Sequence, residues 1–129
     1  MILDTDVLIA LLKGEKDADD AMQVLEDKGG RVVTTVITAY ELLRGAHISS
    51  KPKENLTKVQ NVLSNLELLD LTLQACEEAS KIYRDLRRAG CLIGEFDVLI
   101  AAIARVHNEP IMTRDEHFTP IREINVTDW

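Results

Sequence analysis

Three observations in the sequence predict an α/β domain with a mostly parallel central sheet between two layers of helices. Short apolar or β-branched runs alternate with longer runs of helical period along the whole chain. Strands separated by helices pair in parallel, and their crossovers place the helices on both faces of the sheet. The length of 129 residues suits one domain, which we expect to span residues 1–129.

Helix caps and glycines set the expected boundaries in the first half of the chain. Ser, Thr, Asp and Asn are favoured at helix N-termini, and glycine is favoured just beyond C-termini. The expected elements are a strand at 1–3, a helix from Thr5 or Asp6 to Gly14, a helix from Asp17 to Gly29, a strand at 31–35 and a helix from a Thr35 cap to about His47.

The second half continues the alternation and contains the most apolar helix of the chain. Residues 95–107 include a nearly continuous hydrophobic run, which predicts burial on most sides of this helix. The other expected elements are a core helix with an apolar stripe at 56–66, an edge strand at 68–71, a helix from Thr72 to Gly90, a strand at 111–113, a turn of helix after Asp115 and a last strand at 124–126.

Composition excludes several classes of protein. The formal net charge is −7 and aromatic residues make up 4% of the chain, so neither a broad basic face nor a platform of stacked rings is expected to hold nucleic acid. The longest uncharged stretch, 32–40, is too short for a membrane span, and no signal peptide precedes Asp4. We therefore expect a cytoplasmic protein, in which Cys76 and Cys91 are thiols packed as small apolar residues.

Four carboxylates are expected at one edge of the sheet. Asp4 follows the first strand, Asp115 follows a later strand, and Asp97 lies in the first turn of the apolar helix. Glu41 lies inside the helix after the second strand, from where its side chain can point back toward the strand ends. Ligands of parallel sheets bind beyond the carboxyl ends of the strands, so this edge is the expected functional site.

Such a cluster needs a counter-charge. Two carboxylates about 4 Å apart repel by roughly 4 kcal/mol at an effective dielectric constant near 20. Ligation by oxygen atoms alone suits Mg²⁺ or Mn²⁺ better than zinc. These cations promote phosphodiester hydrolysis because they activate water and neutralise charge on phosphorus. The sequence therefore favours a metal-dependent phosphodiesterase, in which the cation links an acidic protein to a polyanionic substrate.

Each carboxylate also has a purely structural interpretation. Asp97 suits the positive end of a helix dipole, and Glu41 fits a capping box that begins three residues earlier. Asp4 and Asp6 can form an N-cap pair, and Asp115 can be a turn residue that starts a short helix. The position, type and number of these residues together favour the functional interpretation.

Four segments, in order along the chain, carry a resemblance to a known family. They are ILDTDVLI at 2–9, TAYELLRGA at 38–46, IGEFDVLIAA at 93–102 and TRDEHF at 113–118. These segments resemble the PIN-domain ribonucleases, and most closely the VapC-type toxins of toxin–antitoxin pairs. The match covers essentially the whole chain and implies a PIN-like three-layer α/β/α sandwich.

The resemblance also implies an activity and its partners. It implies an endoribonuclease that depends on Mg²⁺ or Mn²⁺, forms a homodimer and is blocked by a cognate antitoxin. Its catalytic residues would be the four carboxylates. Asp4 and Asp97 would be the principal metal ligands, while Glu41 and Asp115 would bind the metal directly or through water.

Residues beside the carboxylates are candidate contacts to RNA. Arg44 and Arg114 are expected to bind phosphate, because a guanidinium group matches phosphate oxygens, although surface charge or a salt bridge is an equal alternative. Thr113 is a third candidate. Asp6 stands where many family members carry Asn or Ser, and we expect it to cap the first helix. His117 stands where Asp is common, and we expect it to be a surface or capping residue.

Three other functions compete with the toxin. A housekeeping PIN nuclease in RNA processing would carry the same motifs and would differ in its genomic context. A haloacid-dehalogenase-type phosphatase would use Asp4 as a nucleophile, but Leu8 departs from its first motif and its later Gly-Asp motif is absent. A PIN scaffold without catalysis would not need all four acidic positions.

Overall fold

The computed structural model describes residues 1–129 and contains one five-stranded sheet, in which all neighbouring strands are parallel. The strand order is β3-β2-β1-β4-β5. The strands are β1 (Ile2–Leu3), β2 (Val33–Thr35), β3 (Glu67–Leu69), β4 (Ile111–Met112) and β5 (Val126–Thr127). The expected α/β sandwich is confirmed, and its sheet is parallel throughout.

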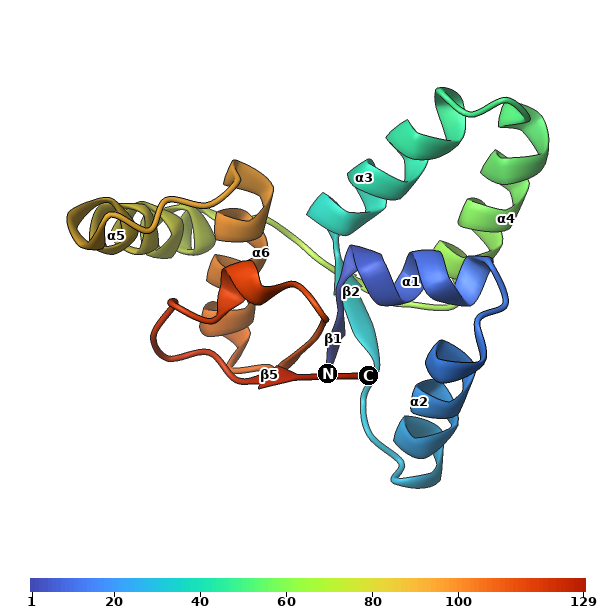
Figure 1. Cartoon of the computed structure of the whole chain (residues 1–129), viewed down its shortest axis with the longest axis horizontal. Coiled ribbons are helices and arrows are strands. Elements are labelled where there is room, and N and C mark those ends of the chain that lie inside the picture. Colours follow the sequence, from blue (N-terminus) through green and yellow to red (C-terminus); the bar gives the residue numbers. More distant parts are fainter.

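Helices cover both sides of this sheet (Figure 1). A core cluster around α5 and α6 lies on one side, and a second cluster built from α1 to α4 lies on the other. The helices are α1 (Thr5–Leu12), α2 (Lys16–Asp27), α3 (Val36–His47), α4 (Pro52–Ser64), α5 (Leu73–Ala89) and α6 (Glu95–His107), and one 3₁₀ turn, η1 (Glu116–Phe118), follows β4.

The strands divide their side chains between the two clusters. Ile2 and Ile111 belong to the cluster with α5 and α6, whereas Leu3 and Met112 belong to the other. This division follows from the pleat, in which successive side chains point to opposite faces. Both faces of the central strands are thus buried, which is why these strands read as short apolar runs rather than alternating ones.

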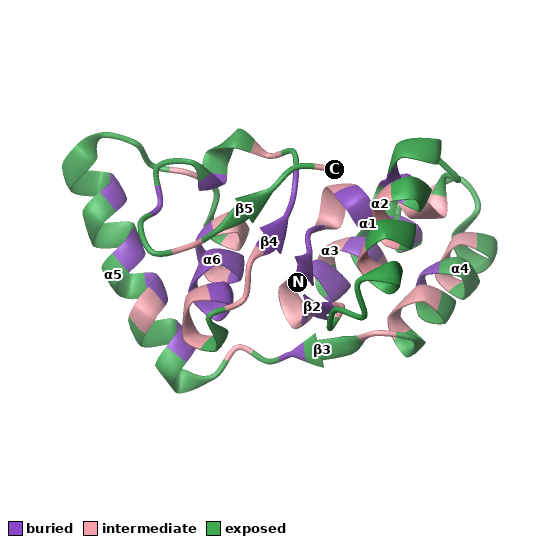
Figure 2. Cartoon of the chain, turned by 90° about the horizontal axis from the view of Figure 1, so that it is seen from below, coloured by how far each residue is buried: buried purple, intermediate pink, exposed green.

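Several helix boundaries confirm the expected caps. The Thr72 side chain accepts a hydrogen bond from the Ala75 N–H at the start of α5, and Gly90 ends the same helix in the left-handed conformation, with φ of 70°. In α6, the run Ile100–Ala104 is entirely buried. Figure 2 shows this helix as the most buried one, while the other helices bury mainly one stripe each.

Some expectations about local structure are wrong. Helix α2 begins at Lys16 after Glu15, so Asp17 lies in its first turn and is not the cap. The last strand comes slightly later than expected, because Val126 and Thr127 are the residues that pair with β4. Cys76 and Cys91 are free but exposed, so neither packs in the core. No helix is both long and apolar enough to cross a membrane, as expected.

The carboxyl ends of three neighbouring strands open on one edge of the sheet, which we call the rim. Helix α1 starts there after β1, α3 starts there after β2, and the loop to η1 starts there after β4. The first turn of α6 lies at the same level, beside the start of α3 (Figure 1). The fold therefore brings four segments that are far apart in the sequence to one place.

Candidate active site

Asp4 lies at the centre of the rim, at the junction of β1 and α1. Its residue is 4% exposed, and its Oδ2 accepts a 2.7 Å hydrogen bond from the Thr113 hydroxyl. Burial raises the pKa of Asp4 from its ordinary value of 3.8 to about 7. The hydrogen bond from Thr113 opposes this rise, and the charges of Asp6 and Asp97 add to it. An ionised Asp4 is therefore costly unless a positive charge is near.

Thr113 connects the strand ends beneath Asp4. It is 2% exposed, and its hydroxyl also accepts a 3.0 Å hydrogen bond from the Asp115 backbone N–H. One side chain thus fixes the Asp4 carboxylate and the start of the loop that carries Asp115. This burial corrects the expectation that Thr113 contacts RNA, because the structure leaves almost none of its surface free for a substrate.

Asp97 lies in the first turn of α6 and is half-buried. Burial raises its pKa above the ordinary value. The charge of Asp115 also raises it, His117 lowers it, and the charge of Glu41 raises it. Asp97 is thus within electrostatic reach of carboxylates from α3 and from the loop after β4, and it acts in turn on Asp4. The three other predicted carboxylates are thus within electrostatic reach of Asp97, but only Asp115 joins Asp97 and His117 in a group of ligand atoms within 4.8 Å of one another, and Asp4 and Glu41 lie outside that group.

Glu41 reaches the rim from the second turn of α3. Its Oε1 accepts a 3.0 Å hydrogen bond from the Thr5 hydroxyl of α1. The capping-box interpretation is wrong, because the N-cap of α3 is Thr35, whose side chain accepts from the Thr38 N–H, and Thr38 is buried inside the helix. Glu41 therefore makes no cap, and its carboxylate faces α1 and the rim.

Asp115 and His117 flank Asp97 from the loop after β4. The Asp115 side chain caps η1, since its Oδ1 accepts a 2.9 Å hydrogen bond from the His117 N–H. The His117 Nδ1 lies 3.1 Å from Asp115 Oδ1 and 3.4 Å from Asp97 Oδ2. Ligand atoms of these three residues all lie within 4.8 Å of one another. His117 is exposed, as expected, and its imidazole also lies beside these carboxylates.

Asp6 is not the N-cap residue of α1, although its Oδ1 accepts a 2.6 Å hydrogen bond from the Val7 N–H in the first turn of that helix. Its Oδ2 accepts a 2.7 Å hydrogen bond from the Arg114 backbone N–H and lies 3.2 Å from the Thr113 hydroxyl. The residue at the N-cap of α1 is Asp4, and Asp6 lies in the first turn. Asp6 therefore holds the loop after β4 against α1, which is a positioning role that its place in the sequence does not reveal.

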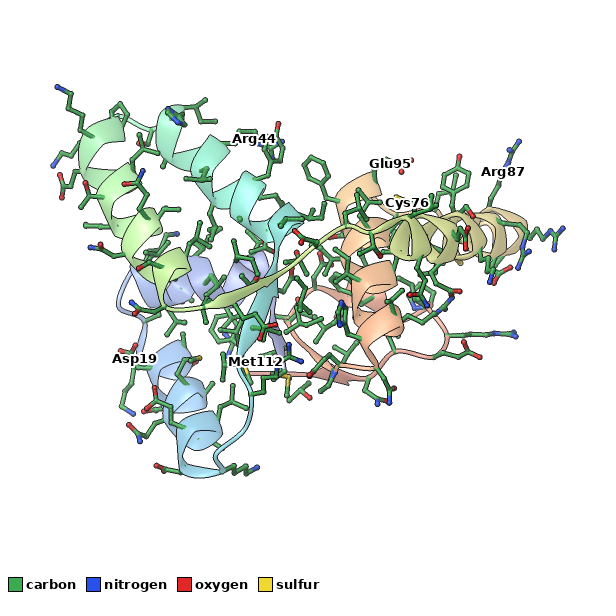
Figure 3. All side chains as sticks on the ribbon, turned by 180° about the vertical axis from the view of Figure 1, so that it is seen from behind. Asp19, Arg44, Cys76, Arg87, Glu95 and Met112 are labelled. Atoms are coloured by element: carbon green, nitrogen blue, oxygen red, sulfur yellow. The ribbon has the colours of Figure 1, made fainter.

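The two candidate arginines lie in different surroundings. The Arg44 guanidinium carbon is 5.3 Å from the ring centroids of both Tyr40 and Phe96, which meet edge to face (Figure 3 labels Arg44 on α3). Arg114 instead stacks on Trp129, at 3.7 Å from the ring centroid, and forms ion pairs with Asp17 and Asp128. These contacts occupy the Arg114 side chain, whereas no carboxylate pairs with Arg44.

Sequence reasoning missed the two aromatic rings beside Arg44. Tyr40 immediately precedes Glu41, and Phe96 immediately precedes Asp97, so each ring is adjacent in sequence to a candidate ligand. That adjacency was the only available signal, because the stacking depends on how α3 and α6 approach each other.

The donor set of the rim fits a small divalent cation. Carboxylates gather around Asp97, the pKa values of Asp4 and Asp97 are raised, and the only cationic candidate within ion-pair distance of the four carboxylates is the imidazole of His117. Clustered carboxylate oxygens with one imidazole are ligands that Mg²⁺ and Mn²⁺ accept. A cation bound there would relieve both the burial cost and the mutual repulsion.

Comparison with known proteins places this arrangement in a family. The family model described as PIN domain matches residues 1–124. The chain belongs to the PIN-domain family. This PIN domain is 30% identical to the tRNA(fMet)-specific endonuclease VapC of Salmonella typhimurium, over 99% of this chain and 96% of that protein. It is 33% identical to Ribonuclease VapC1 of Methanocaldococcus jannaschii, over 98% of this chain and 84% of that protein.

Solved structures agree with the sequence relatives. The PIN domain superimposes on a chain of VapBC2 from Rickettsia felis, bound to a DNA fragment from its promoter, with a TM-score of 0.91 and 25% identity over 99% of this chain and 97% of that chain. It superimposes on a chain of the DNA-bound VapBC of Salmonella typhimurium with a TM-score of 0.90 and 30% identity, over 99% of this chain and 96% of that chain. Both are complexes of the toxin–antitoxin type.

Proposed function

We propose that this PIN domain is an endoribonuclease that hydrolyses RNA phosphodiester bonds in the cytoplasm, as the toxin of a type II toxin–antitoxin system. The observation that carries the proposal is that carboxylates from the β1–α1 junction, α3 and the loop after β4 lie within electrostatic reach of Asp97. The VapC names of its relatives support the same activity.

We further propose that the activity depends on Mg²⁺ or Mn²⁺. Asp4 and Asp97 would be the principal ligands, and Glu41 and Asp115 would bind directly or through water. When bound, the cation supplies activation of water and neutralisation of charge at the scissile phosphate. The raised pKa values of Asp4 and Asp97 support this assignment, because burial and neighbouring carboxylates make both groups costly to ionise and a bound cation would relieve that cost.

The remaining rim residues would hold the carboxylates and the RNA. Thr113 and Asp6 position Asp4 and the loop after β4 through the hydrogen bonds described above. Arg44 is the arginine that we propose for phosphate contact, since it forms no ion pair and lies on α3 one helical turn from Glu41. Arg114 would first have to leave Trp129 and its two aspartates, so the proposal does not depend on it.

Cleavage of RNA by the purified protein tests the proposed activity. EDTA should abolish cleavage, added Mg²⁺ or Mn²⁺ should restore it, and Asp97→Asn should lose it. Asp19→Asn is a matched control, because it makes the same change on the exposed surface of α2, away from α6 (Figure 3). Undiminished cleavage by Asp97→Asn, in a preparation free of host nuclease, would refute the acidic site.

The alternative functions make different predictions. A haloacid-dehalogenase-type phosphatase would release phosphate from small monoesters, and a scaffold without catalysis would bind RNA or protein without cutting. A housekeeping nuclease would cut RNA as proposed here. It would be distinguished by its genomic context, because no neighbouring gene would encode a small DNA-binding protein that suppresses the activity.

We propose that a cognate antitoxin inhibits the protein by placing a cationic side chain among the carboxylates. A hollow of about 540 Å³ between α1, α3 and α4 supports this proposal, since Glu41 lines it together with apolar side chains such as Leu12 and Val59. A peptide in this hollow would reach the rim at Glu41. Leu12→Asp should weaken inhibition by the antitoxin while leaving RNA cleavage in place.

We also propose that the protein is a homodimer. Large apolar side chains are exposed at the start of α5 and in the loop before α6, where Leu73 is 77% and Leu92 is 54% exposed. Burial of such side chains against a second copy would remove apolar surface from water. Light scattering should report a dimer for the parent and a monomer for Leu73→Glu. The matched control Val24→Glu, on α2, should stay dimeric.

A further inference from the structure

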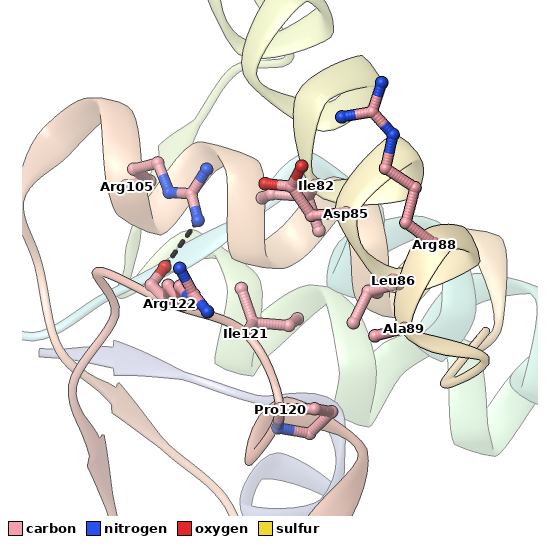
Figure 4. A pocket seen from close by; sticks show the side chains of 9 residues that line it. All are labelled: Ile82, Asp85, Leu86, Arg88, Ala89, Arg105, Pro120, Ile121 and Arg122. Carbon is pink, nitrogen blue, oxygen red and sulfur yellow. Dashed lines mark hydrogen bonds between the residues drawn. The ribbon is translucent and has the colours of Figure 1, made fainter.

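Five of the eight arginines of the chain line two adjoining hollows at the C-terminal end of α5. One hollow, of about 410 Å³, lies between α5, α6 and the loop after η1, and it is drawn in Figure 4. The other, of about 450 Å³, lies on the outer surface of α5. The five residues are Arg84, Arg87, Arg88, Arg105 and Arg122, and Arg88 lines both hollows.

Three of these arginines have no carboxylate partner. Arg84 pairs with Asp85 through a hydrogen bond that lowers the pKa of Asp85, and the charge of Arg88 also lowers it. Arg105 pairs with Glu78 and Glu123 and donates to the Arg122 carbonyl oxygen. Arg87, Arg88 and Arg122 form no ion pair, and their residues are exposed. We call these three the free arginines. They are concentrated at one end of a chain whose net charge is −7.

Helix stability explains only part of this concentration. Arg87 and Arg88 lie in the last turn of α5, where cations interact favourably with the helix dipole. Arg122 lies in the loop after η1, outside any helix, so the dipole gives no reason for its place beside them. The grouping of cations from two separate segments points to an anionic ligand.

The position of the free arginines favours the RNA substrate as that ligand. Figure 3 shows Arg87 at the outer end of α5 and Glu95 at the start of α6, both on the side of the molecule where Arg44 projects from α3. Arg88 and Arg122 line the hollow together with Arg105, which lies in the last turn of α6, whereas Asp97 lies in its first turn. The free arginines are thus outside the cluster of carboxylates. Guanidinium groups match phosphate oxygens, and phosphates recur along an RNA backbone.

We propose that Arg87, Arg88 and Arg122 form a second RNA-binding surface, which holds backbone phosphates of a structured RNA at a distance from the scissile bond. This inference rests on the proposed ribonuclease function. It gives the acidic protein an electrostatic hold on its substrate that the rim, with its carboxylates, does not provide. The protein should therefore prefer a large folded RNA to a short one, because only a large RNA can contact the rim and the free arginines at the same time.

Substrate length therefore provides the test. The substrates are full-length tRNA and a short oligonucleotide that carries the same mapped cleavage site. Arg87→Gln with Arg88→Gln should raise KM for the tRNA at least several-fold and leave cleavage of the oligonucleotide unchanged. Arg122→Gln alone should give a smaller rise of the same kind, and it does not alter a helix. Lys51→Gln with Lys53→Gln removes two exposed, unpaired cations near the start of α4, and it should behave as the parent.

The salt dependence of binding gives a second measurement. Fluorescence anisotropy of labelled tRNA, with Asp97→Asn in every protein to prevent cleavage, reports affinity without catalysis. Raising the salt concentration from 50 to 200 mM lowers the affinity of a protein that contacts phosphates. In the variant that has lost two phosphate contacts, this loss of affinity should be about tenfold smaller than in the Asp97→Asn protein with all its arginines. A role in helix stability alone would instead lower Tm while leaving KM and the salt slope unchanged.

The outcomes separate this inference from the proposed function. If the parent cuts tRNA and the arginine variants cut it with the same KM, the second surface is refuted and the ribonuclease stands. If the parent cuts no RNA, the proposed function fails, and the anisotropy comparison still decides whether the free arginines bind RNA. Equal losses on the tRNA and on the oligonucleotide would also refute the inference, because a distant surface cannot affect a substrate that does not reach it.

Discussion

The hydroxyl of Thr113 donates a 2.7 Å hydrogen bond to the carboxylate of Asp4, although the two residues are 109 positions apart in the sequence. This bond joins the ends of β1 and β4, which are neighbours in the sheet. It also directs one oxygen of a buried carboxylate, so that the orientation of Asp4 is fixed before any ligand binds. Neutral hydrogen-bond donors therefore hold the rim in shape, and His117 is the only cationic candidate within ion-pair distance of its four carboxylates.

The metal-free protein should lose stability as the pH rises through the range in which Asp4 ionises. The pKa of Asp4 is about 7 in the fold and near 3.8 when the chain is unfolded, so the folded state keeps this proton longer. Protonation of Asp4 therefore adds at most about 4 kcal/mol to the free energy of unfolding. This stabilisation is fully present below about pH 4 and is lost above pH 7. Asp4→Asn should lack this dependence. Urea unfolding in EDTA from pH 4 to 8 measures it.

The parent and Asp4→Asn are compared by how steeply their free energies of unfolding change with pH, and not by their stability at one pH. An asparagine amide at position 4 has its own burial cost, which shifts the whole curve but does not change with pH. Asp19→Asn, on the exposed surface of α2, should give a curve parallel to that of the parent. Parallel curves for the parent and Asp4→Asn would show that Asp4 is already ionised in the metal-free fold.

Thr113→Val should weaken metal binding more than it weakens the fold. The substitution keeps the shape of the side chain, but it leaves Asp4 and the Asp115 N–H without the hydroxyl. Loss of a residue that orients a ligand typically costs about 10- to 100-fold in metal affinity or activity. Calorimetric titration with Mn²⁺ and RNA cleavage rates measure the effect. Thr113→Ser keeps the hydroxyl and should recover most of it, whereas an equal loss in both variants would indicate a packing defect.

Glu41→Gln should lose activity with little change in stability. Glu41 makes one side-chain hydrogen bond, from Thr5, which glutamine can still accept. The cap of α3 is Thr35, so Thr35→Ala should show the opposite result, with about 1 kcal/mol of stability lost and activity per folded molecule retained. Thermal unfolding and cleavage rates, compared for the two variants, separate the roles. A Glu41→Gln protein that unfolds earlier yet cuts normally would refute the metal-binding role of Glu41 and leave it a structural one.

The sheet and the positions of the four carboxylates were predictable because they depend on period and topology. Strand β1 and helix α6 each have a strong apolar pattern, and parallel strands must place their carboxyl ends at one edge. Asp4 therefore had to lie on the rim once β1 was assigned. Asp97 followed in the same way, since it lies in the first turn of α6.

The parts that sequence did not reveal depend on the path of loops and on side-chain packing. His117 meets Asp97 only because η1 turns the chain back toward α6, and a 3₁₀ turn of three residues has no periodic pattern. Asp6 was assigned to a helix cap because capping is the commonest local use of Asp near a helix start. Besides the neighbouring Val7 N–H, its carboxylate accepts from the Arg114 N–H, which lies 108 positions away. Contacts between residues so far apart cannot be predicted from local sequence patterns.

His117→Ala should change the metal preference of the protein. Atoms of His117, Asp97 and Asp115 lie close enough together to share one cation. Imidazole is a ligand that Mn²⁺ accepts more readily than Mg²⁺, which prefers oxygen ligands and water. The variant should therefore lose affinity for Mn²⁺ while binding Mg²⁺ nearly as the parent does. The protection that each cation gives against thermal unfolding reports its affinity, because a ligand of the folded state stabilises it in proportion to RT ln(1 + [L]/Kd).

The same measurement on His107→Ala gives the control for loss of an imidazole. His107 is exposed at the end of α6, the end opposite to Asp97, so this substitution should leave both metals unaffected. An equal loss of Mg²⁺ and Mn²⁺ binding in His117→Ala would indicate that His117 only orients Asp97 and Asp115. Unchanged binding of both metals would return His117 to the surface role expected from its sequence, and the carboxylates alone would then form the metal site.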